Sequence, residues 1–357
     1  MPQFQAYSCD AISGTVIDRI PASAFPYSRM LSAGDSGSSI TIPLDGTFSR
    51  TELKALTVPR ARLITLERDG AVEYMGFPNG DSYTRGSASV TFPLVDWWAV
   101  AKTRGAWNHG APNVEQWKTT IVGNLAAQAS AAVIRGRDSG PALPAMGFPM
   151  TIPGFPGGTP VTRTYFGYHL ETINDVLSDL MSEGLDVYTR PRWIVSGRAD
   201  WLLEAGISWA SGLTREFMVT APGSPVTSFT ATSDASRMTN NARYVGEGSE
   251  VDMLIRSNRN TLSPYPLMDR TTQAKNISDV DQLTALANRD LVAFGAPTSQ
   301  WEFKLPGDEP CDVGDTVRLG FEGDAWIPDD WYALRVVGIK GDLVDEKTVV
   351  VQPTGGA

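Results

Sequence analysis

The chain has 357 residues, of which 42% are hydrophobic and 20% charged, with a formal net charge of −10. This composition supports a folded interior of two or three domains, and the acidic balance argues against a dedicated nucleic-acid binder, which needs clustered Lys and Arg to neutralise phosphates. No apolar run is long enough to cross a bilayer and the N-terminus lacks the pattern of a signal peptide, so we expect a protein made in a cytoplasm without stable membrane insertion.

The first hundred residues have the texture of a small antiparallel barrel or sandwich, with short alternating segments between turns. Asp69-Gly70 is a strong hairpin signal. The candidate strands are Gln5–Asp10, Thr15–Ile20, Ser39–Leu44, Ala61–Arg68, Ala71–Phe77 and Ser87–Val95. We therefore predict a first β-barrel over residues 1–100.

An α/β insert is expected over residues 105–221. Val114, Trp117, Ile121 and Leu125 fall at helical spacing and predict a helix. The segment Ser139–Thr162 then has six prolines, five glycines and no period, which is typical of a functional or mobile loop. Its apolar side chains are candidates for an interface, although packing on its own domain is equally consistent with the pattern. These residues are Leu143, Met146, Phe148, Met150, Ile152 and Phe155.

The segment Tyr168–Ile207 gives the clearest local prediction, a helix that leads into a hairpin. Its helical face consists of Leu170, Ile173, Val176, Leu177, Leu180 and Met181, and Gly184 can end the helix in the left-handed conformation. Alternation from Leu185 and the turn at Ser196-Gly197 indicate the two strands. A helix joined to a hairpin needs a partner surface for its apolar face.

The remainder is expected to contain one more helix between strands. Val226–Ala231 alternates and Ala242–Val245 follows a polar turn, and a long irregular connection leads to a helix with Ser278 as its N-cap and Gly295 near its end. The closing strands are Ser299–Leu305, Asp315–Phe321, Tyr332–Ile339 and Thr348–Gln352. We predict a second β-barrel from residues 222–248 and 298–357, with 249–297 as the helical part of the insert, and so a mainly β (α+β) fold with two small tube-like β-barrel domains and inserted α/β domains.

Acidic residues are concentrated near the C-terminus. Residues 308–347 contain eleven acids and four bases, so this segment alone carries a charge of −7. Such a segment could form an acidic face or channel, or consist of solvated turn acids. The candidates are Asp308, Glu309, Asp312, Asp315, Asp329 and Asp330.

No constellation typical of catalysis, cofactor binding or metal binding is present in the sequence. His109 and His169 lack metal-ligand spacing, and neither a GxSxG elbow nor a Walker or GxGxxG loop occurs. Cys9 and Cys311 form no CxxC pair and are interpreted as buried apolar residues. The ten tryptophans suit a core, a subunit contact or sugar binding.

The helix and hairpin LETINDVLSDLMSEGLDVYTRPRW…GRADWLLEAGI, the N-terminal VPRARLITLERDGAVEYMGFP and the closing CDVGDTVRLGF…DDWYALRVVGIKGD…KTVVVQP together resemble a tail hub protein of a long-tailed bacteriophage. Such hubs are minor tail proteins in phages of actinobacteria and are similar to the baseplate hub of contractile tails. The likeness spans nearly the whole chain and lies in its organisation.

The resemblance implies a homotrimer at the virion's tail tip, assembled in the host cytoplasm, whose barrels form a ring around a channel for the tape measure protein and DNA. DNA would pass without specific binding. The ring would join the distal tail protein or tail tube to tip or fibre proteins, and no peptidase or lysozyme domain is expected in this chain. The alternatives are a carbohydrate-binding β module of a tail tip and, less favoured, a hydrolase with dispersed carboxylates.

Overall fold

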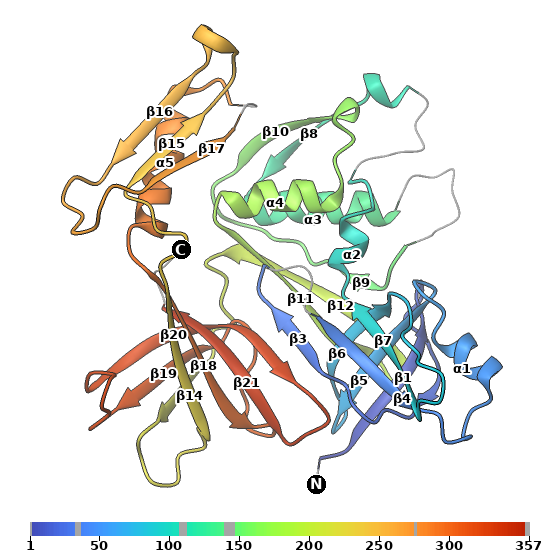
Figure 1. Ribbon diagram of the computed structural model, residues 1–357. Helices are drawn as coiled ribbons and strands as arrows, with labels where there is room; N and C mark the ends of the chain where they lie inside the picture. The colour runs from blue at the N-terminus through green and yellow to red at the C-terminus, as the bar shows by residue number, and fades with distance from the viewer. Residues whose placement is uncertain (1, 33–36, 107–112, 139–146, 275–276, 354–357) are drawn as a thin grey trace.

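The computed structural model describes residues 2–32, 37–106, 113–138, 147–274 and 277–353. Strands dominate these ranges, which confirms the mainly β class with α/β inserts. Two curved sheets lie side by side at the base of the molecule, and the insert and a smaller α/β unit stand above them (Figure 1).

The first sheet is antiparallel and has the strand order β2-β1-β5-β6-β7-β4. Its strands match the six that the alternation predicts: β1 Phe4–Asp10, β2 Val16–Ile20, β4 Ser38–Pro43, β5 Arg62–Arg68, β6 Ala71–Pro78 and β7 Ser89–Val95. The predicted Asp69-Gly70 turn joins β5 to β6, with φ of 49° and 87° at the two residues. A helix that the alternation does not reveal, α1 Arg50–Leu56, lies between β4 and β5.

Both faces of the first sheet are buried. On β5, Ile64 and Leu66 belong to a core shared with the second sheet, whereas Leu63 belongs to a second core, which it shares with the insert. Side chains alternate between the faces of a strand, so a sheet covered on both sides reads as a nearly continuous apolar run. The first sheet therefore serves as the surface on which the other domains pack.

The second sheet has the order β13-β19-β20-β21-β18-β14, and β3 also pairs with β20. The four predicted closing strands are present as β18 Thr298–Pro306, β19 Thr316–Phe321, β20 Asp330–Gly341 and β21 Glu346–Pro353. The other members are β3 Tyr27–Met30, β13 Thr214–Met218 and β14 Ser228–Asp234. Thus β13 lies in this sheet although we expected residues 105–221 to belong to the insert, and β3 crosses over from the N-terminal region.

In the insert, helices α3 and α4 pack on each other and on two small sheets, with strand orders β10-β8 and β11-β12-β9 (Figure 1). The elements are α2 Trp98–Ala101, η1 Val114–Gln116, β8 Lys118–Gly123, α3 Leu125–Asp138, β9 Met150–Thr151, β10 Val161–Phe166, η2 Gly167–His169, α4 Ile173–Ser182, β11 Leu185–Val195 and β12 Arg198–Ile207.

The predicted helix and hairpin are α4, β11 and β12. The Thr172 N–H donates to Asp175 Oδ2 at 2.9 Å and the Asp175 N–H donates to Thr172 Oγ1 at 3.1 Å, a capping box that starts α4 two residues after Leu170. Leu170 therefore lies outside the helix and is exposed.

The helix predicted from Val114, Trp117 and Ile121 is wrong in its first half. Residues 118–123 form β8, because the β-branched run from Thr119 to Val122 favours an extended chain. Helix begins only in the alanine-rich segment after Asn124, whose Oδ1 accepts the N–H of Ala127 at 2.7 Å.

The smaller unit consists of β15 Asn241–Val245, β16 Ile255–Arg259, β17 Asp269–Gln273 and α5 Val280–Phe294, with η3 Glu250–Asp252 between β15 and β16. Its strand order is β16-β15-β17, and Tyr244 and Leu283 lie in its own small core. Consequently β15 does not join the second sheet, as the range 222–248 predicted. Asp279 rather than Ser278 caps α5, since its Oδ1 accepts the N–H of Asp281 at 2.8 Å.

Candidate functional site at the junction of the domains

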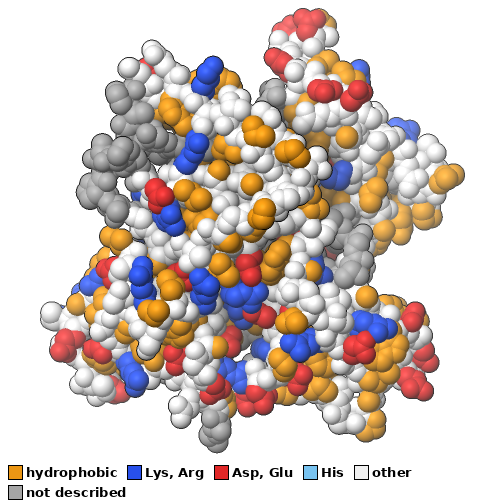
Figure 2. Space-filling model, turned by 180° about the vertical axis from the view of Figure 1, so that it is seen from behind, with side chains coloured by type: hydrophobic (Ala, Val, Ile, Leu, Met, Phe, Trp, Pro, Cys, Tyr) orange, Lys and Arg blue, Asp and Glu red, His pale blue; other side chains and the backbone are white. Residues whose placement is uncertain are grey.

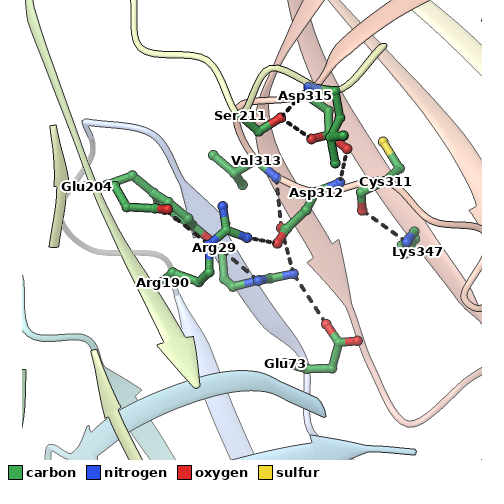
Figure 3. Close-up of polar contacts among 12 residues, drawn as sticks. Arg29, Glu73, Arg190, Glu204, Ser211, Cys311, Asp312, Val313, Asp315 and Lys347 are labelled. Carbon is green, nitrogen blue, oxygen red and sulfur yellow. Dashed lines mark hydrogen bonds and ion pairs between the residues drawn. The ribbon is translucent and has the colours of Figure 1, made fainter. Parts of the chain in front are cut away.

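Five charged side chains from separate elements meet between the two sheets and the insert (Figure 3). Arg29 comes from β3, Glu73 from β6, Arg190 and Glu204 from the β11–β12 hairpin, and Asp312 from the connection between β18 and β19. They line an open cavity of about 560 Å³. We call these five residues the junction network, because each domain except the smaller unit contributes to it.

Arg29 reaches the network because β3 lies directly on β20. A bulge between Val336 and Gly338 shifts the pairing of β20 with β21, and Gly338 then pairs with Met30. A Cβ on Gly338 would lie 2.1 Å from the Met30 Sδ. A glycine at this position therefore leaves room for the Met30 thioether over β20.

Glu73 is directed into the network by another bulge. On β6, Tyr74 pairs with Leu66 and Val72 pairs with Glu67, so Glu73 is the extra residue. An extra residue bends the strand and redirects its side chain. The Glu73 carboxylate lies 3.3 Å from the Arg29 Nη2 and also accepts the Tyr27 hydroxyl.

Asp312 bridges the two arginines. Its Oδ1 lies 3.2 Å from the Arg29 Nη2 and its Oδ2 pairs with Arg190 Nη1. Burial raises the pKa of this carboxyl, but the two guanidinium groups outweigh burial, so the pKa lies below its ordinary value of 3.8. Burial raises the pKa of Glu204, although Arg190 lies 3.1 Å away and opposes the rise.

The connection that carries Asp312 is itself fixed by polar contacts. The buried Asp315 accepts the N–H of Asp312 at 3.0 Å and the hydroxyl of Ser211. Lys347 donates to the carbonyl oxygens of Glu309 and Cys311, and burial lowers its pKa. These contacts fix the position of Asp312. The junction network can therefore act as an interlock, by which we mean a set of ion pairs that holds the two sheets and the insert in fixed relative positions.

The long hairpin also ties the insert to both sheets outside the network. At its open end, Trp209 N–H donates to Asp186 Oδ2 at 2.9 Å, and Arg335 of β20 pairs with the same carboxylate. Farther along, Trp193 Nε1 donates to Glu67 of β5 at 2.9 Å. The open end of the hairpin thus contacts the second sheet, and its far end contacts the first sheet.

The predicted acidic residues divide between the junction cavity and the surface beyond it. Asp308, Glu309, Asp312 and Asp315 line the cavity, whereas Asp329 and Asp330 are exposed near the start of β20. On the face that Figure 2 shows, acidic side chains are interspersed with basic ones. An acidic channel surface remains a prediction for the exposed members only.

The described part of the candidate interface loop packs on its own domain. Phe148 and Met150 are buried, with the Phe148 ring 6.3 Å from that of Trp97 and Met150 paired with Trp201. Ile152 and Phe155 are partly buried on the same core. Leu143 and Met146 lie outside the described residues, so contact with a neighbour stays a prediction for them.

The tryptophans divide between core and surface. Trp97, Trp98 and Trp201 are buried, whereas Trp326 and Trp331 are exposed. Trp107 lies outside the described residues, and the other four are half-buried. Most of the tryptophan content is thus explained by packing.

No further chemistry is evident among the described residues. Within these ranges, no three His, Cys, Asp or Glu side chains are grouped so that they could hold a metal ion. Cys9 and Cys311 are free and buried, which confirms their interpretation as apolar residues. The helices of the described ranges are too short or too polar to cross a membrane.

Comparison with known proteins gives a fold but no sequence family. No family model matches the chain, and no curated protein matches it. Among solved structures, it aligns with the 43 kDa tail protein of prophage MuSo2 from Shewanella oneidensis at a TM-score of 0.59 and 9% identity, covering 99% of this chain and 98% of that one. The tail protein from Neisseria meningitidis aligns at a TM-score of 0.57 and 11% identity, covering 99% of this chain and 97% of that one.

Prophage tail protein gp18 from Listeria monocytogenes gives a TM-score of 0.54 at 8% identity, covering 99% of this chain and 95% of that one. The chain also aligns with a type VI secretion component from E. coli at a TM-score of 0.50 and 10% identity, covering 99% of this chain and 77% of that one. That component is described as similar to the phage T4 tail proteins gp27 and gp5. The chain therefore has the fold of these phage tail proteins, in agreement with the resemblance in sequence organisation.

Proposed function

We propose that this chain is a structural hub at the distal end of a phage tail, where three copies form a ring that joins the tail tube or distal tail protein to tip or fibre proteins. The observation that carries the proposal is that the likeness to tail proteins includes both sheets and both inserted units, since it covers 99% of the chain. A shared fold alone does not specify function, so the adaptor role rests on the site as well.

The junction network supports a mechanical role. Paired, half-buried charges between domains fix their relative positions, because a shift of one domain would leave a guanidinium or carboxylate without its partner. A ring around a conduit for the tape measure protein and DNA requires subunits of fixed shape. In this proposal the chain acts by assembly rather than as an enzyme.

The proposal is tested by locating the chain in a virion. Fab fragments raised against the exposed strand β16, Ile255–Arg259, are mixed with intact particles and observed by negative-stain electron microscopy. We expect density at the distal tip of the tail, and none with Fab that has been adsorbed on the purified chain. Fab density on the capsid or along the tail shaft would refute the proposed location.

A carbohydrate-binding module is the second candidate, and the exposed Trp326 and Trp331 are the observation in its favour. A glycan array tests it. Binding that is lost in Trp326→Ala would support this candidate, and the absence of any bound glycan would remove it.

A further inference from the structure

A largely apolar groove beside α1 has a volume of about 770 Å³. Its rim consists of Leu44, Val58 and Tyr83, whose exposed fractions of 43%, 37% and 53% are high for such side chains. Its floor is made by Phe48, Leu53, Val90 and Phe92. Apolar surface gathered around a concavity is typical of a contact site.

The turn between β19 and β20 holds a side chain of the kind that fills such a groove. Trp326 is 86% exposed. Its backbone is nevertheless fixed, because the Asp324 carboxylate accepts the N–H groups of Trp326 and Ile327 at 2.8 Å each, and Ile327 is buried beneath the turn. An ordered turn that presents an indole to solvent loses little conformational entropy on binding.

The groove and the turn lie at opposite ends of the two-sheet body (Figure 1). The Gly341 end of β20 pairs with Tyr27 of β3 beside the first sheet, so the β19–β20 turn lies at the end of the second sheet that is remote from it. The groove flanks the β7 and β4 side of the first sheet. Trp326 therefore cannot fill the groove of its own chain, and a contact between the two must join different copies.

The charges around the two features are complementary. The turn and the adjoining start of β20 contain Glu322, Asp324, Asp329 and Asp330. The groove is lined by Arg50 and Lys54 against a single acid, Asp81. Opposite charges on the two surfaces favour this pairing in one orientation and suppress the contact of two like surfaces.

We propose that the β19–β20 turn of one copy of this chain docks in the α1 groove of a second copy, with Trp326 as the central anchor. Such a contact is head-to-tail, and it generates a ring when the rotation between copies closes. The inference rests on the proposed homotrimeric hub and specifies the contact that would build it.

Sedimentation of the purified full chain over a range of concentrations tests the contact. We expect the wild type to associate and Trp326→Ala to raise the dissociation constant of each contact about 30-fold or more, as for a buried aromatic anchor. Val251→Ala is the matched control, because Val251 is 95% exposed but lies on the smaller unit. Arg50→Asp with Lys54→Asp should also weaken association, and adding Glu322→Lys with Asp330→Lys should restore it.

A cysteine pair tests the same contact when association is weak. Ala325→Cys with Val58→Cys keeps Trp326 and should give a disulfide between copies on mild oxidation, whereas Ala325→Cys with Ser257→Cys should not. If the wild type and Trp326→Ala associate equally, the contact is overturned and a ring built by other surfaces survives. If the chain neither associates nor cross-links, the contact is overturned together with self-assembly in solution, while Fab labelling still decides separately whether the chain belongs to the tail tip.

Discussion

The Nη2 atom of Arg29 lies 3.2 Å from the Oδ1 atom of Asp312, which joins a strand from the N-terminal region to a connection in the second sheet. Arg29 is only 10% exposed, so loss of Asp312 would leave this nearly buried cation with the Glu73 carboxylate alone. The pair and its neighbours connect the first sheet, the hairpin and the second sheet through one carboxylate. Its removal is therefore the most direct test of the interlock.

Asp312→Asn should lower the free energy of unfolding by about 2 kcal/mol, which is less than the 3–5 kcal/mol of a fully buried pair because Asp312 is 33% exposed. Urea unfolding followed by tryptophan fluorescence measures the loss. Asp308→Asn, at an exposed site of the same connection, should change stability by less than about 0.5 kcal/mol. Equal effects of the two substitutions would contradict the interlock.

The same carboxylate predicts how stability depends on pH. Because the pKa of Asp312 is lowered in the folded protein, its contribution is fully present above the ordinary value of 3.8 and is lost as pH falls through the lower, folded value. Wild-type stability should thus fall more steeply below pH 3.8 than that of Asp312→Asn. Parallel curves from thermal melts in this range would show that Asp312 is not coupled to folding.

Gly14 should be the most sensitive of the glycines in turns beside the hairpin. Its φ is +72°, and a Cβ there would lie 1.9 Å from the carbonyl oxygen of Ala199 on β12. Gly14→Ala should therefore cost roughly 3 kcal/mol or more, from a clash with backbone in addition to strain. Gly70→Ala is the matched control, since Gly70 has a φ of +87° and open space around it, and should cost about 1 kcal/mol. Similar losses in urea unfolding would disprove the close approach.

Both thiols should be inert in the native protein. Burial raises the pKa of Cys9 to about 11 and that of Cys311 to about 12, and the thiolate is the reactive form. Ellman's reagent at pH 8 should therefore label neither residue until urea unfolds the chain, when both should react. Rapid labelling without denaturant would show that one of these sites opens readily.

Local patterns in the sequence predict the elements that carry their own signals. The α4–β11–β12 unit was predictable because its apolar spacing, its glycine and its turn agree with one another. In contrast, β16 and β17 have no alternating apolar residues, since their side chains are nearly all polar, and only pairing with β15 makes them strands. A strand that forms only because it pairs with a segment distant in the sequence has no pattern of its own from which it could be predicted.

The junction network could not be predicted for the same reason. Arg29 lies in a strand of four residues, and Glu73 enters the site only because a bulge shifts the register of β6. Of the acids proposed from composition, only Asp312 belongs to the junction network, although Asp308, Glu309 and Asp315 line the same cavity. One feature of the sequence did point to the junction network, the Arg-Pro-Arg run at 190–192. Positive charge inside a predicted strand indicates an ion-pair partner elsewhere in the fold.

Cryo-electron microscopy of the phage tail that contains this chain tests the central claim most directly. The proposed hub predicts three copies at the distal tip, with first and second sheets alternating around an open channel and Trp326 of each copy seated beside α1 of the next. A single copy, a ring without these sheets at the channel, or a tail tip from which the chain is absent would contradict it.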